Sequence, residues 1–327
     1  MKRALIIGIA GQDGSYLAEH LLELGYEVFG VVRRNSTPEH QQSRIHHLSA
    51  HIQTFYGDLT DSYSLESVLK KSNPSEIYNL GAQSHVRISF EVPQFTGQVN
   101  GMGVLNLLTV VKQIDPSIRV YQASSSEMFG DSVDSDGFQR ESTPMEPVSP
   151  YGCSKLYGYH IVRNYRRAYG MFASNGILFN HESPRRGSNF VTSKVVKAAC
   201  EIKLGLSHRL EIGNLDSSRD WGHSKDYVRA MVLILNHTIA DDFVVATGQT
   251  HTVRDLINKV FELLELEPEQ FVFQNPKYLR PEELPYLRGD AAKVKSTLGW
   301  EPSVTFDVLI EEMVNFYMEQ LTLKIQT

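Results

Sequence analysis

Short, mostly apolar segments recur along the chain, and small or polar residues follow each of them. The segments at 4–7, 26–32, 52–56, 77–80, 120–123 and 173–179 have the length of strands, and those at 4–7 and 120–123 are expected to be buried. Longer segments at 15–24, 100–111 and 149–169 carry apolar residues at helical spacing. Strands that alternate with helices predict an α/β fold, with a doubly wound parallel sheet.

Gly8, Gly11 and Gly14 lie between the first predicted strand and the first predicted helix. Glycines allow a tight turn there and let the backbone approach a pyrophosphate at the helix N-terminus. The spacing is G-x-x-G-x-x-G, and its place between a buried strand and a helix indicates a Rossmann-type dinucleotide site.

Arg33 and Arg34 end the second predicted strand, where an NAD-binding Rossmann unit carries an acidic residue. Arginine suits a 2′-phosphate, so the sequence favours NADP over NAD. The alternative interpretation is a pair of solvated arginines in a loop.

Tyr151 and Lys155 lie four residues apart on the helix predicted at 149–169, and therefore on one face of it. A lysine cation beside a phenol favours the phenolate, so we expect the pKa of Tyr151 to fall and Tyr151 to act as a general acid/base. The alternative is a surface pair on an amphipathic helix. The glycine turn and the polar run 124–127, which follows a predicted buried strand, favour the catalytic interpretation.

The last third of the chain carries predicted helices at 252–264 and 306–317, with a loop-rich stretch containing Pro276, Pro281 and Pro285 between them. This pattern is typical of a smaller C-terminal substrate-binding lobe. We assign residues 1–180, with 216–248 returning to them, to the dinucleotide-binding domain, and residues 181–215 and 249–327 to the lobe.

The chain has 32 Lys and Arg against 38 Asp and Glu, a net charge of −6. Such a balance offers no general attraction to nucleic acid or to an anionic membrane, so an anionic substrate needs a local basic cluster.

Cys153 and Cys200 could form one disulfide, but a reduced cytoplasmic protein is favoured. Histidines at 40, 46, 47 and 51 lack Cys, Asp or Glu at matching spacing, so we expect no metal site.

Together these features resemble the extended short-chain dehydrogenase/reductases that act on nucleotide sugars and, within them, the GDP-mannose 4,6-dehydratases. Segments 7–19, 78–86, 122–124, 175–187 and 219–223 carry the resemblance, which covers nearly the whole chain. The run Asn-His-Glu-Ser-Pro-Arg-Arg-Gly at 180–187 is its most specific part, because it lies beyond the generic dinucleotide fold.

The resemblance implies that GDP-D-mannose is converted to GDP-4-keto-6-deoxy-D-mannose and water, in GDP-deoxysugar biosynthesis, by a homodimer or homotetramer. Tyr151, helped by Lys155, would take the proton of the sugar C4 hydroxyl while hydride passes to bound NADP. Glu127 would remove the C5 proton and help the C6 hydroxyl leave. Ser125, where the family usually has Thr, would hydrogen-bond the 4-oxygen, and NADPH would return hydride to C6.

The resemblance also implies two binding sets. The NADP set is Gly8, Gly11, Gln12, Asp13, Gly14, Arg33, Asp58, Leu59, Leu80, Ala82, Ser84, Tyr151, Lys155, His181 and Arg186. The GDP-sugar set is Ser84, Ser125, Glu127, Tyr151, Asn180, Lys194, Arg219, Arg280 and Glu283. Arg185 is expected to join the cations of the second set at the diphosphate.

Other functions remain open. A dehydratase of a related sugar such as GDP-manno-heptose would carry the same catalytic residues. A GDP-4-keto-6-deoxysugar reductase or a nucleotide-sugar 4-epimerase would generally lack an acid/base at Glu127. A non-catalytic nucleotide-sensing or scaffolding protein would be favoured by loss of Tyr151, Lys155 or Glu127, and all three are present.

Overall fold

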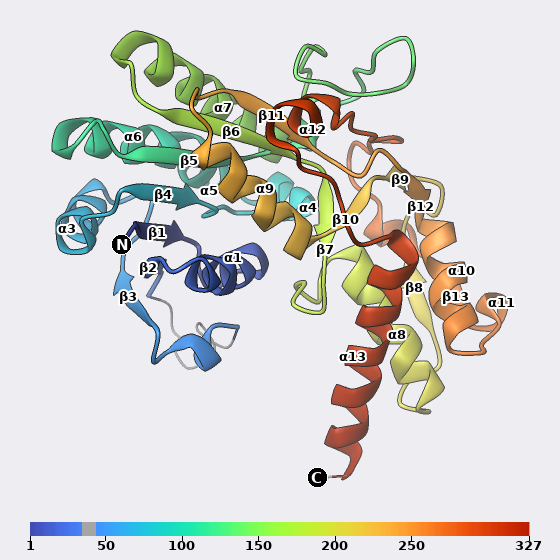
Figure 1. The fold of residues 1–327 in the computed structure, drawn as a ribbon. Helices are drawn as coiled ribbons and strands as arrows, with labels where there is room; N and C mark the ends of the chain where they lie inside the picture. The colour runs from blue at the N-terminus through green and yellow to red at the C-terminus, as the bar shows by residue number, and fades with distance from the viewer. Residues whose placement is uncertain (35–43, 327) are drawn as a thin grey trace.

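A parallel sheet lies at the centre of the molecule (Figure 1). The structure, a computed structural model, describes residues 1–34 and 44–326. Within these residues the sheet has seven strands, and every pairing in it is parallel. In spatial order they are β11 (Asp242–Val245), β6 (Ala173–Leu178), β5 (Arg119–Ser125), β4 (Glu76–Asn79), β1 (Arg3–Ile7), β2 (Glu27–Val32) and β3 (Ile52–Tyr56). The predicted Rossmann-type doubly wound sheet is confirmed.

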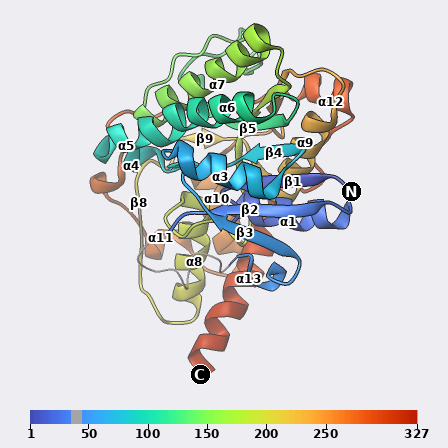
Figure 2. The same ribbon diagram turned by 90° about the vertical axis from the view of Figure 1, so that its left-hand side faces the viewer.

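Helices cover both faces of the sheet. One face carries α3 (Ser62–Ser72), α6 (Gly103–Ile114) and α7 (Pro150–Tyr169), which pack side by side (Figure 2). The other carries α1 (Gln12–Glu23), α9 (Ser224–Asn236) and α12 (Ala292–Leu298). Two clusters of buried apolar side chains, one beneath each helical layer, form the core of this part. The central strands β1, β4, β5 and β6 are therefore largely buried on both faces, as expected for parallel strands, whereas β3 at the edge of the sheet is partly exposed.

Helix α7 has clear start and stop signals. The Ser149 side chain accepts a hydrogen bond from the Gly152 N–H at 3.0 Å, and Pro150 occupies the first helical position. Gly170 ends the helix in the left-handed conformation, with a φ of +66°. These caps fix the ends of the helix that bears Tyr151 and Lys155.

Short segments α4 (Val86–Glu91), α5 (Pro93–Gly97) and a π-helical turn (Gln98–Met102) lead into α6. Beyond the sheet, a second apolar core joins helices to a two-stranded ladder and forms the C-terminal lobe at the lower right of Figure 1. Its elements are α8 (Val191–Lys203), β8 (Leu210–Ile212), α10 (Val253–Leu263), α11 (Pro268–Phe271), β13 (Val272–Gln274) and α13 (Phe306–Gln326). None of the helices in the described residues is both long enough and apolar enough to cross a membrane.

Two short ladders join the sheet to the lobe. β7 (Asn180–Glu182) pairs with β10 (Trp221–His223), and β9 (Ser218–Arg219) pairs with β12 (His251–Thr252). Segments that the sequence presents as loops therefore meet at the carboxyl edge of the sheet, where open α/β folds bind ligands.

Candidate functional site

The glycine turn is shaped for close approach of a ligand. Gly8 has a φ of +86°, and a Cβ on Gly14 would lie 2.3 Å from the Gly8 carbonyl oxygen. Helix α1 begins at Gln12, and Gly11 before it provides no side-chain cap. The first N–H groups of the helix are thus open to an anion, and the turn fits the pyrophosphate of a dinucleotide.

A cavity of about 360 Å³ extends from this turn to the ends of β2 and β3. Asp58 lies on its wall and accepts hydrogen bonds from the Thr60 N–H and hydroxyl at 2.8 and 2.7 Å, so its carboxylate also stabilises a turn. The predicted cofactor residues that line it are Gly8, Gly11, Gln12, Asp13, Gly14, Arg33, Asp58, Leu59, Leu80, Ala82, Ser84 and Arg186.

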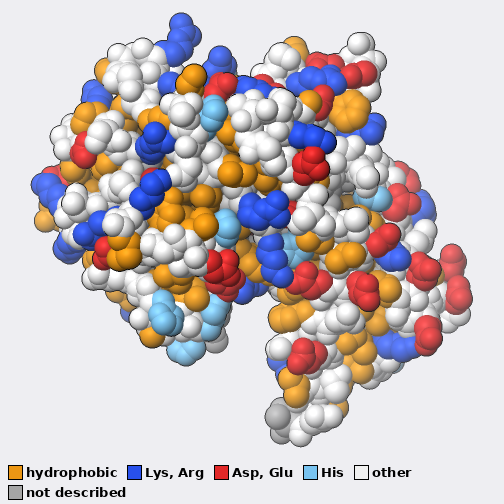
Figure 3. All heavy atoms as spheres, in the orientation of Figure 1, with side chains coloured by type: hydrophobic (Ala, Val, Ile, Leu, Met, Phe, Trp, Pro, Cys, Tyr) orange, Lys and Arg blue, Asp and Glu red, His pale blue; other side chains and the backbone are white. Residues whose placement is uncertain are grey.

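A larger cavity of about 730 Å³ lies between the sheet and the lobe. It meets the smaller one at Asp13, Leu80, Ala82, Ser84 and Arg186, which line both. Lys and Arg side chains gather near the middle of the face shown in Figure 3, beside the notch left of α13. The predicted residues that line only the larger cavity are Ser125, Glu127, Tyr151, Lys155, Asn180, His181, Lys194, Arg219, Arg280 and Glu283.

Tyr151 and Lys155 are both buried in the wall of this cavity. The Lys155 amine donates to the Ala123 carbonyl oxygen at 2.9 Å and lies 5.8 Å from the centroid of the Tyr151 ring. Burial raises the pKa of Tyr151 to about 12, against a smaller opposing effect of a hydrogen bond with Ser125. Burial lowers the pKa of Lys155 to about 8. The expected fall in the pKa of Tyr151 is therefore wrong for the protein by itself, because desolvation outweighs the lysine.

Glu127 follows β5 in a single 3-10 turn (Ser126–Met128), whose N-cap is the Ser125 hydroxyl. The carboxylate is 7% exposed, and its Oε1 lies 3.4 Å from Nη1 of Arg280. Its Oε2 is buried without a hydrogen-bond partner. Glu127 also lines the larger cavity, and one oxygen of its carboxylate is held by no hydrogen bond of the described residues, so the group has capacity to take a proton.

The basic residues around the cavity are held in different ways. Arg219 is buried and donates to the carbonyl oxygens of Ser218 and Leu284, both at 2.9 Å. The Lys194 amine lies 3.4 Å from the ring centroid of Tyr278. These contacts fix two cations in the cavity wall, where they can meet a diphosphate.

Arg185 does not belong to this set, so its assignment to the diphosphate is wrong. Its guanidinium donates to Glu19 at 2.6 Å and to the Ser15 hydroxyl at 3.0 Å, and it lies over the Tyr16 ring. Arg185 and Arg186 are adjacent in a turn that the Arg186 N–H closes on the Ser183 carbonyl oxygen, and their side chains have different partners, Glu19 for Arg185 and Glu182 for Arg186. Arg185 ties the turn to α1, and Arg186 faces both cavities.

Sequence reasoning missed other residues of the larger cavity. His85 is a side-chain cap of α4 and contacts the Asn189 carbonyl oxygen at 3.3 Å. Tyr278 belongs to the proline-containing loop, where no periodic pattern marks it. His85 could have been found from its place shortly after the small residues that follow β4.

In the described residues, no group of three or more His, Cys, Asp and Glu is arranged to hold a metal ion, and His40 lies outside them.

Asp13 and His181 form a partly buried link between α1 and β7. His181 Nε2 lies 2.7 Å from the Asp13 carboxylate, and its Nδ1 lies 2.7 Å from the Phe179 carbonyl oxygen. A carbonyl oxygen and an ionised carboxylate only accept hydrogen bonds, so this pair of contacts favours the doubly protonated ring. Burial opposes this charge, but Asp13 and the two hydrogen bonds raise the pKa of His181. Burial likewise opposes the ionisation of Asp13. The pKa of Asp13 is nevertheless lowered, and the positive charge of His181 is the main cause.

This pair predicts a pH-dependent stability. The raised pKa of His181 contributes stability below about pH 6.5, and that contribution is lost as pH rises through the folded-state pKa. The lowered pKa of Asp13 contributes stability above about pH 4, which is lost at lower pH. We expect Asp13→Asn to cost up to about 3 kcal/mol between these limits, and less once the pH has risen past the folded-state pKa of His181. Melting temperatures of both proteins from pH 5 to 9 test this, and a constant difference would contradict it.

Comparison with known proteins identifies relatives over nearly the whole chain. The family model described as GDP-mannose 4,6 dehydratase matches residues 5–313. A Homo sapiens GDP-mannose 4,6 dehydratase is 48% identical over 97% of this chain and 91% of its own length. A GDP-mannose 4,6-dehydratase of Yersinia enterocolitica is 45% identical over 98% of this chain and 95% of its own. The crystal structure of Thermus thermophilus UDP-glucose 4-epimerase with NAD is 26% identical, with a TM-score of 0.84 over 96% of this chain and 98% of that one.

Proposed function

This chain belongs to the GDP-mannose 4,6-dehydratase family, and we propose that it is an NADP-dependent hydro-lyase that converts GDP-D-mannose to GDP-4-keto-6-deoxy-D-mannose and water. The product serves GDP-deoxysugar biosynthesis. The observation that carries this proposal is the place of Glu127, which lines the same cavity as Tyr151 and Lys155. A simple reductase or 4-epimerase needs no second acid/base of this kind.

The roles of the catalytic residues follow from their chemistry. Tyr151 takes the proton of the C4 hydroxyl, with the Lys155 cation stabilising the phenolate, and Ser125 hydrogen-bonds the 4-oxygen. NADP, when bound, supplies a hydride acceptor and donor and a positive charge. The 4-ketone makes the C5 hydrogen acidic, and Glu127 removes it as a proton. The same carboxyl group then protonates the departing C6 hydroxyl, which leaves as water. The proton held by Tyr151 would pass to C5 as the hydride held by the reduced cofactor is returned to C6, and this completes the 4-keto-6-deoxy product.

Arg33 supports NADP as the cofactor, because it lies at the end of β2 on the wall of the smaller cavity. We expect Arg33→Glu to weaken NADP binding by roughly ten- to a hundredfold and NAD binding far less, since only NADP has a 2′-phosphate for the guanidinium. Titration of cofactor-free protein with each dinucleotide measures both affinities. Equal losses would show that Arg33 does not recognise the 2′-phosphate.

Arg219 supports an anionic substrate, because its buried guanidinium is fixed beside the cavity. Diphosphate contacts are similar in the ground and transition states, so Arg219→Ala should raise KM more than it lowers kcat. A charge-assisted hydrogen bond is worth about 1.5–3 kcal/mol, which corresponds to a rise of roughly ten- to a hundredfold. Steady-state kinetics with GDP-mannose separate the two constants. A fall in kcat with KM unchanged would place Arg219 at the reacting sugar instead.

The decisive experiment is incubation of the purified protein with GDP-mannose and no added cofactor, followed by mass analysis for loss of one water. The cofactor is regenerated in each cycle, so catalytic turnover is expected. GDP-manno-heptose in parallel tests the alternative substrate. Inhibition by UDP as strong as that by GDP would overturn the GDP-sugar assignment, whereas a stoichiometric need for NADPH would favour a reductase.

We also propose a cytoplasmic homodimer or homotetramer that engages neither nucleic acid nor membrane. Five apolar side chains that are more than a third exposed support self-association, because they lie on segments that pack together around α7. They are Ile88, Val92, Phe95, Met102 and Tyr157. Both cysteines are free thiols, which fits a reducing compartment. The domain division at 1–180 with 216–248, against 181–215 with 249–327, is part of the same proposal.

A further inference from the structure

A row of buried polar side chains crosses the sheet. Asn79, Gln122, Asn175 and Asp242 are successive partners on β4, β5, β6 and β11, and all four are buried. Burying polar groups is costly unless they are hydrogen-bonded. Here the Asn79 amide donates to Gln122 at 2.7 Å, and the Asn175 amide donates to the Asp242 carboxylate at 2.8 Å.

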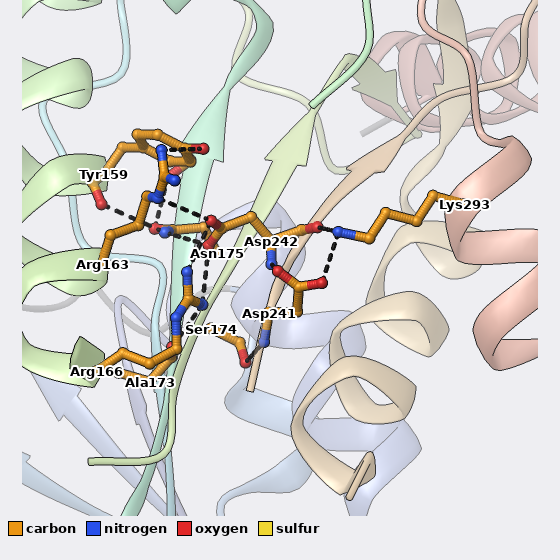
Figure 4. Close-up of polar contacts among 10 residues, drawn as sticks. Tyr159, Arg163, Arg166, Ala173, Ser174, Asn175, Asp241, Asp242 and Lys293 are labelled. Carbon is orange, nitrogen blue, oxygen red and sulfur yellow. Dashed lines mark hydrogen bonds and ion pairs between the residues drawn. The ribbon is translucent and has the colours of Figure 1, made fainter. Parts of the chain in front are cut away.

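Helix α7 presents a matching polar stripe to this row. Tyr151, Lys155, Tyr159, Arg163 and Arg166 follow one another at spacings of three or four residues and therefore share one face of the helix. Figure 4 shows its C-terminal part, where the side chains from α7 converge on β6 and β11.

Asp242 holds the C-terminal end of this stripe. Both terminal nitrogens of Arg166 donate to the Asp242 carboxylate, at 3.1 and 2.8 Å, and Arg163 Nε lies 3.4 Å from it. The Asn175 amide also reaches the Tyr159 carbonyl oxygen at 3.4 Å. Asp242 is largely shielded from water, so a two-point contact with Arg166 restrains both the rotation of α7 about its axis and its position along the sheet.

The hydrogen bonds of the polar row also extend to the end of β5, next to Lys155 and the larger cavity. Asn175 Oδ1 accepts a hydrogen bond from the Ser124 hydroxyl at 3.1 Å, and Ser124 lines the larger cavity. The Ala123 carbonyl oxygen accepts both the Lys155 amine and the Gln122 side-chain amide, each at 2.9 Å. The end of β5 is therefore held from its neighbour β6 and from α7, directly before Ser125 and Glu127.

We propose that Asp242 is a positioning residue for the reaction, acting through Arg166 and Asn175 to hold α7 and the end of β5 in the one arrangement that brings Tyr151 to Glu127. The inference rests on the proposed function. Arg166 lies eleven residues beyond Lys155, about 16 Å along a rigid helix, so a shift at Arg166 is carried to the site. Misplacement of a reacting group by about 1 Å can cost roughly a hundredfold in rate.

Asp241 provides a matched control. It is the preceding carboxylate, its side chain is 47% exposed, and it pairs with Lys293 at 2.7 Å. Its Oδ1 accepts the Asp242 N–H at 2.8 Å, which the amide oxygen of Asn can also do. Asp241→Asn therefore removes a neighbouring charge and leaves the contact of Asp242 with α7 in place.

The experiment compares Asp242→Asn with Asp241→Asn in the purified holoenzyme acting on GDP-mannose. We expect Asp242→Asn to lower kcat by roughly ten- to a hundredfold with KM within about threefold. It should also move the acidic limb of the kcat–pH profile to higher pH, because a shift of α7 against β5 weakens the hydrogen bond of Tyr151 with Ser125, which lowers the pKa of Tyr151. Asp241→Asn should match the wild type. A lowered melting temperature with kcat and the pH profile unchanged would reduce Asp242 to a structural role and overturn the proposal.

Arg166→Lys covers the case in which Asp242→Asn does not fold, because it keeps the charge and removes the two-point contact. The same loss of kcat is expected from it, and an unchanged kcat would overturn the proposal. Combining it with Asp242→Asn should add little, because both changes break one interaction.

Hydrogen exchange separates this inference from the proposed function. Amides at the N-terminal end of α7 should exchange faster in Asp242→Asn than in Asp241→Asn, whether or not the protein turns over GDP-mannose. An inactive wild type would refute the function alone. Equal exchange in the two variants would refute the positioning role alone.

Discussion

Replacing Glu127 with Gln is expected to slow water loss by roughly 10²–10⁴-fold while leaving oxidation at C4 in place. Gln has nearly the shape of Glu and keeps a hydrogen-bonding oxygen, but it cannot take a proton from C5. The variant loses the charge that faces Arg280, so a modest change in substrate binding is also expected. Because Glu127 Oε2 has no partner within the protein, the change leaves no hydrogen bond of that atom broken.

Mass analysis distinguishes the two steps. Wild type should release a product lighter by one water, whereas Glu127→Gln should accumulate a sugar that has lost two hydrogens and kept its C6 hydroxyl. Nucleotide affinity, measured by GDP titration, serves as the control for folding. Water loss within a few-fold of the wild-type rate would eliminate Glu127 as the base.

Tyr151→Phe is expected to block the reaction one step earlier, with a loss of roughly 10²–10⁴-fold and no oxidised sugar. The phenol is the group that takes the C4 hydroxyl proton, and Phe preserves the packing of a side chain that is 9% exposed. Burial holds the pKa of Tyr151 at about 12 in the protein alone, so turnover in wild type should rise with pH as the phenolate becomes accessible.

A comparison of Tyr151→Phe with Glu127→Gln tests which residue acts first. Tyr151→Phe should form neither the oxidised sugar nor the dehydrated one, and its residual rate should lose the rise with pH. If Tyr151→Phe accumulated the same oxidised sugar as Glu127→Gln, a different residue would have to be the C4 base.

The sheet was predictable because each strand has its own local signal. Mostly apolar segments followed by small or polar residues mark six of its seven strands, whereas β11 is a four-residue strand that begins with the buried Asp242 and was not predicted. Helices α3 and α8 were not predicted either. The ladder of β7 with β10 was not predictable from local pattern, because three-residue strands have too few positions to show a period.

The sequence predicted which residues line the site better than it predicted their pKa values and contacts. The residues predicted from motif resemblance line two adjoining cavities, because a motif marks the residues that meet a ligand. It does not record burial, which reverses the expected pKa shift of Tyr151. Nor does it record which way neighbouring side chains point, and this is why Arg185 was misassigned.

The all-parallel register has a consequence for how the chain folds as it is made. Parallel neighbours cannot be joined by a tight turn, so every strand pair waits for a crossover to be synthesised. The larger cavity takes side chains from Asp13 to Glu283, so the site cannot exist until nearly the whole chain has left the ribosome. Until β6 emerges, β5 is an open edge with unpaired backbone groups. Nascent chains that stop between these two strands therefore expose a strand edge that can pair with other chains until β6 arrives.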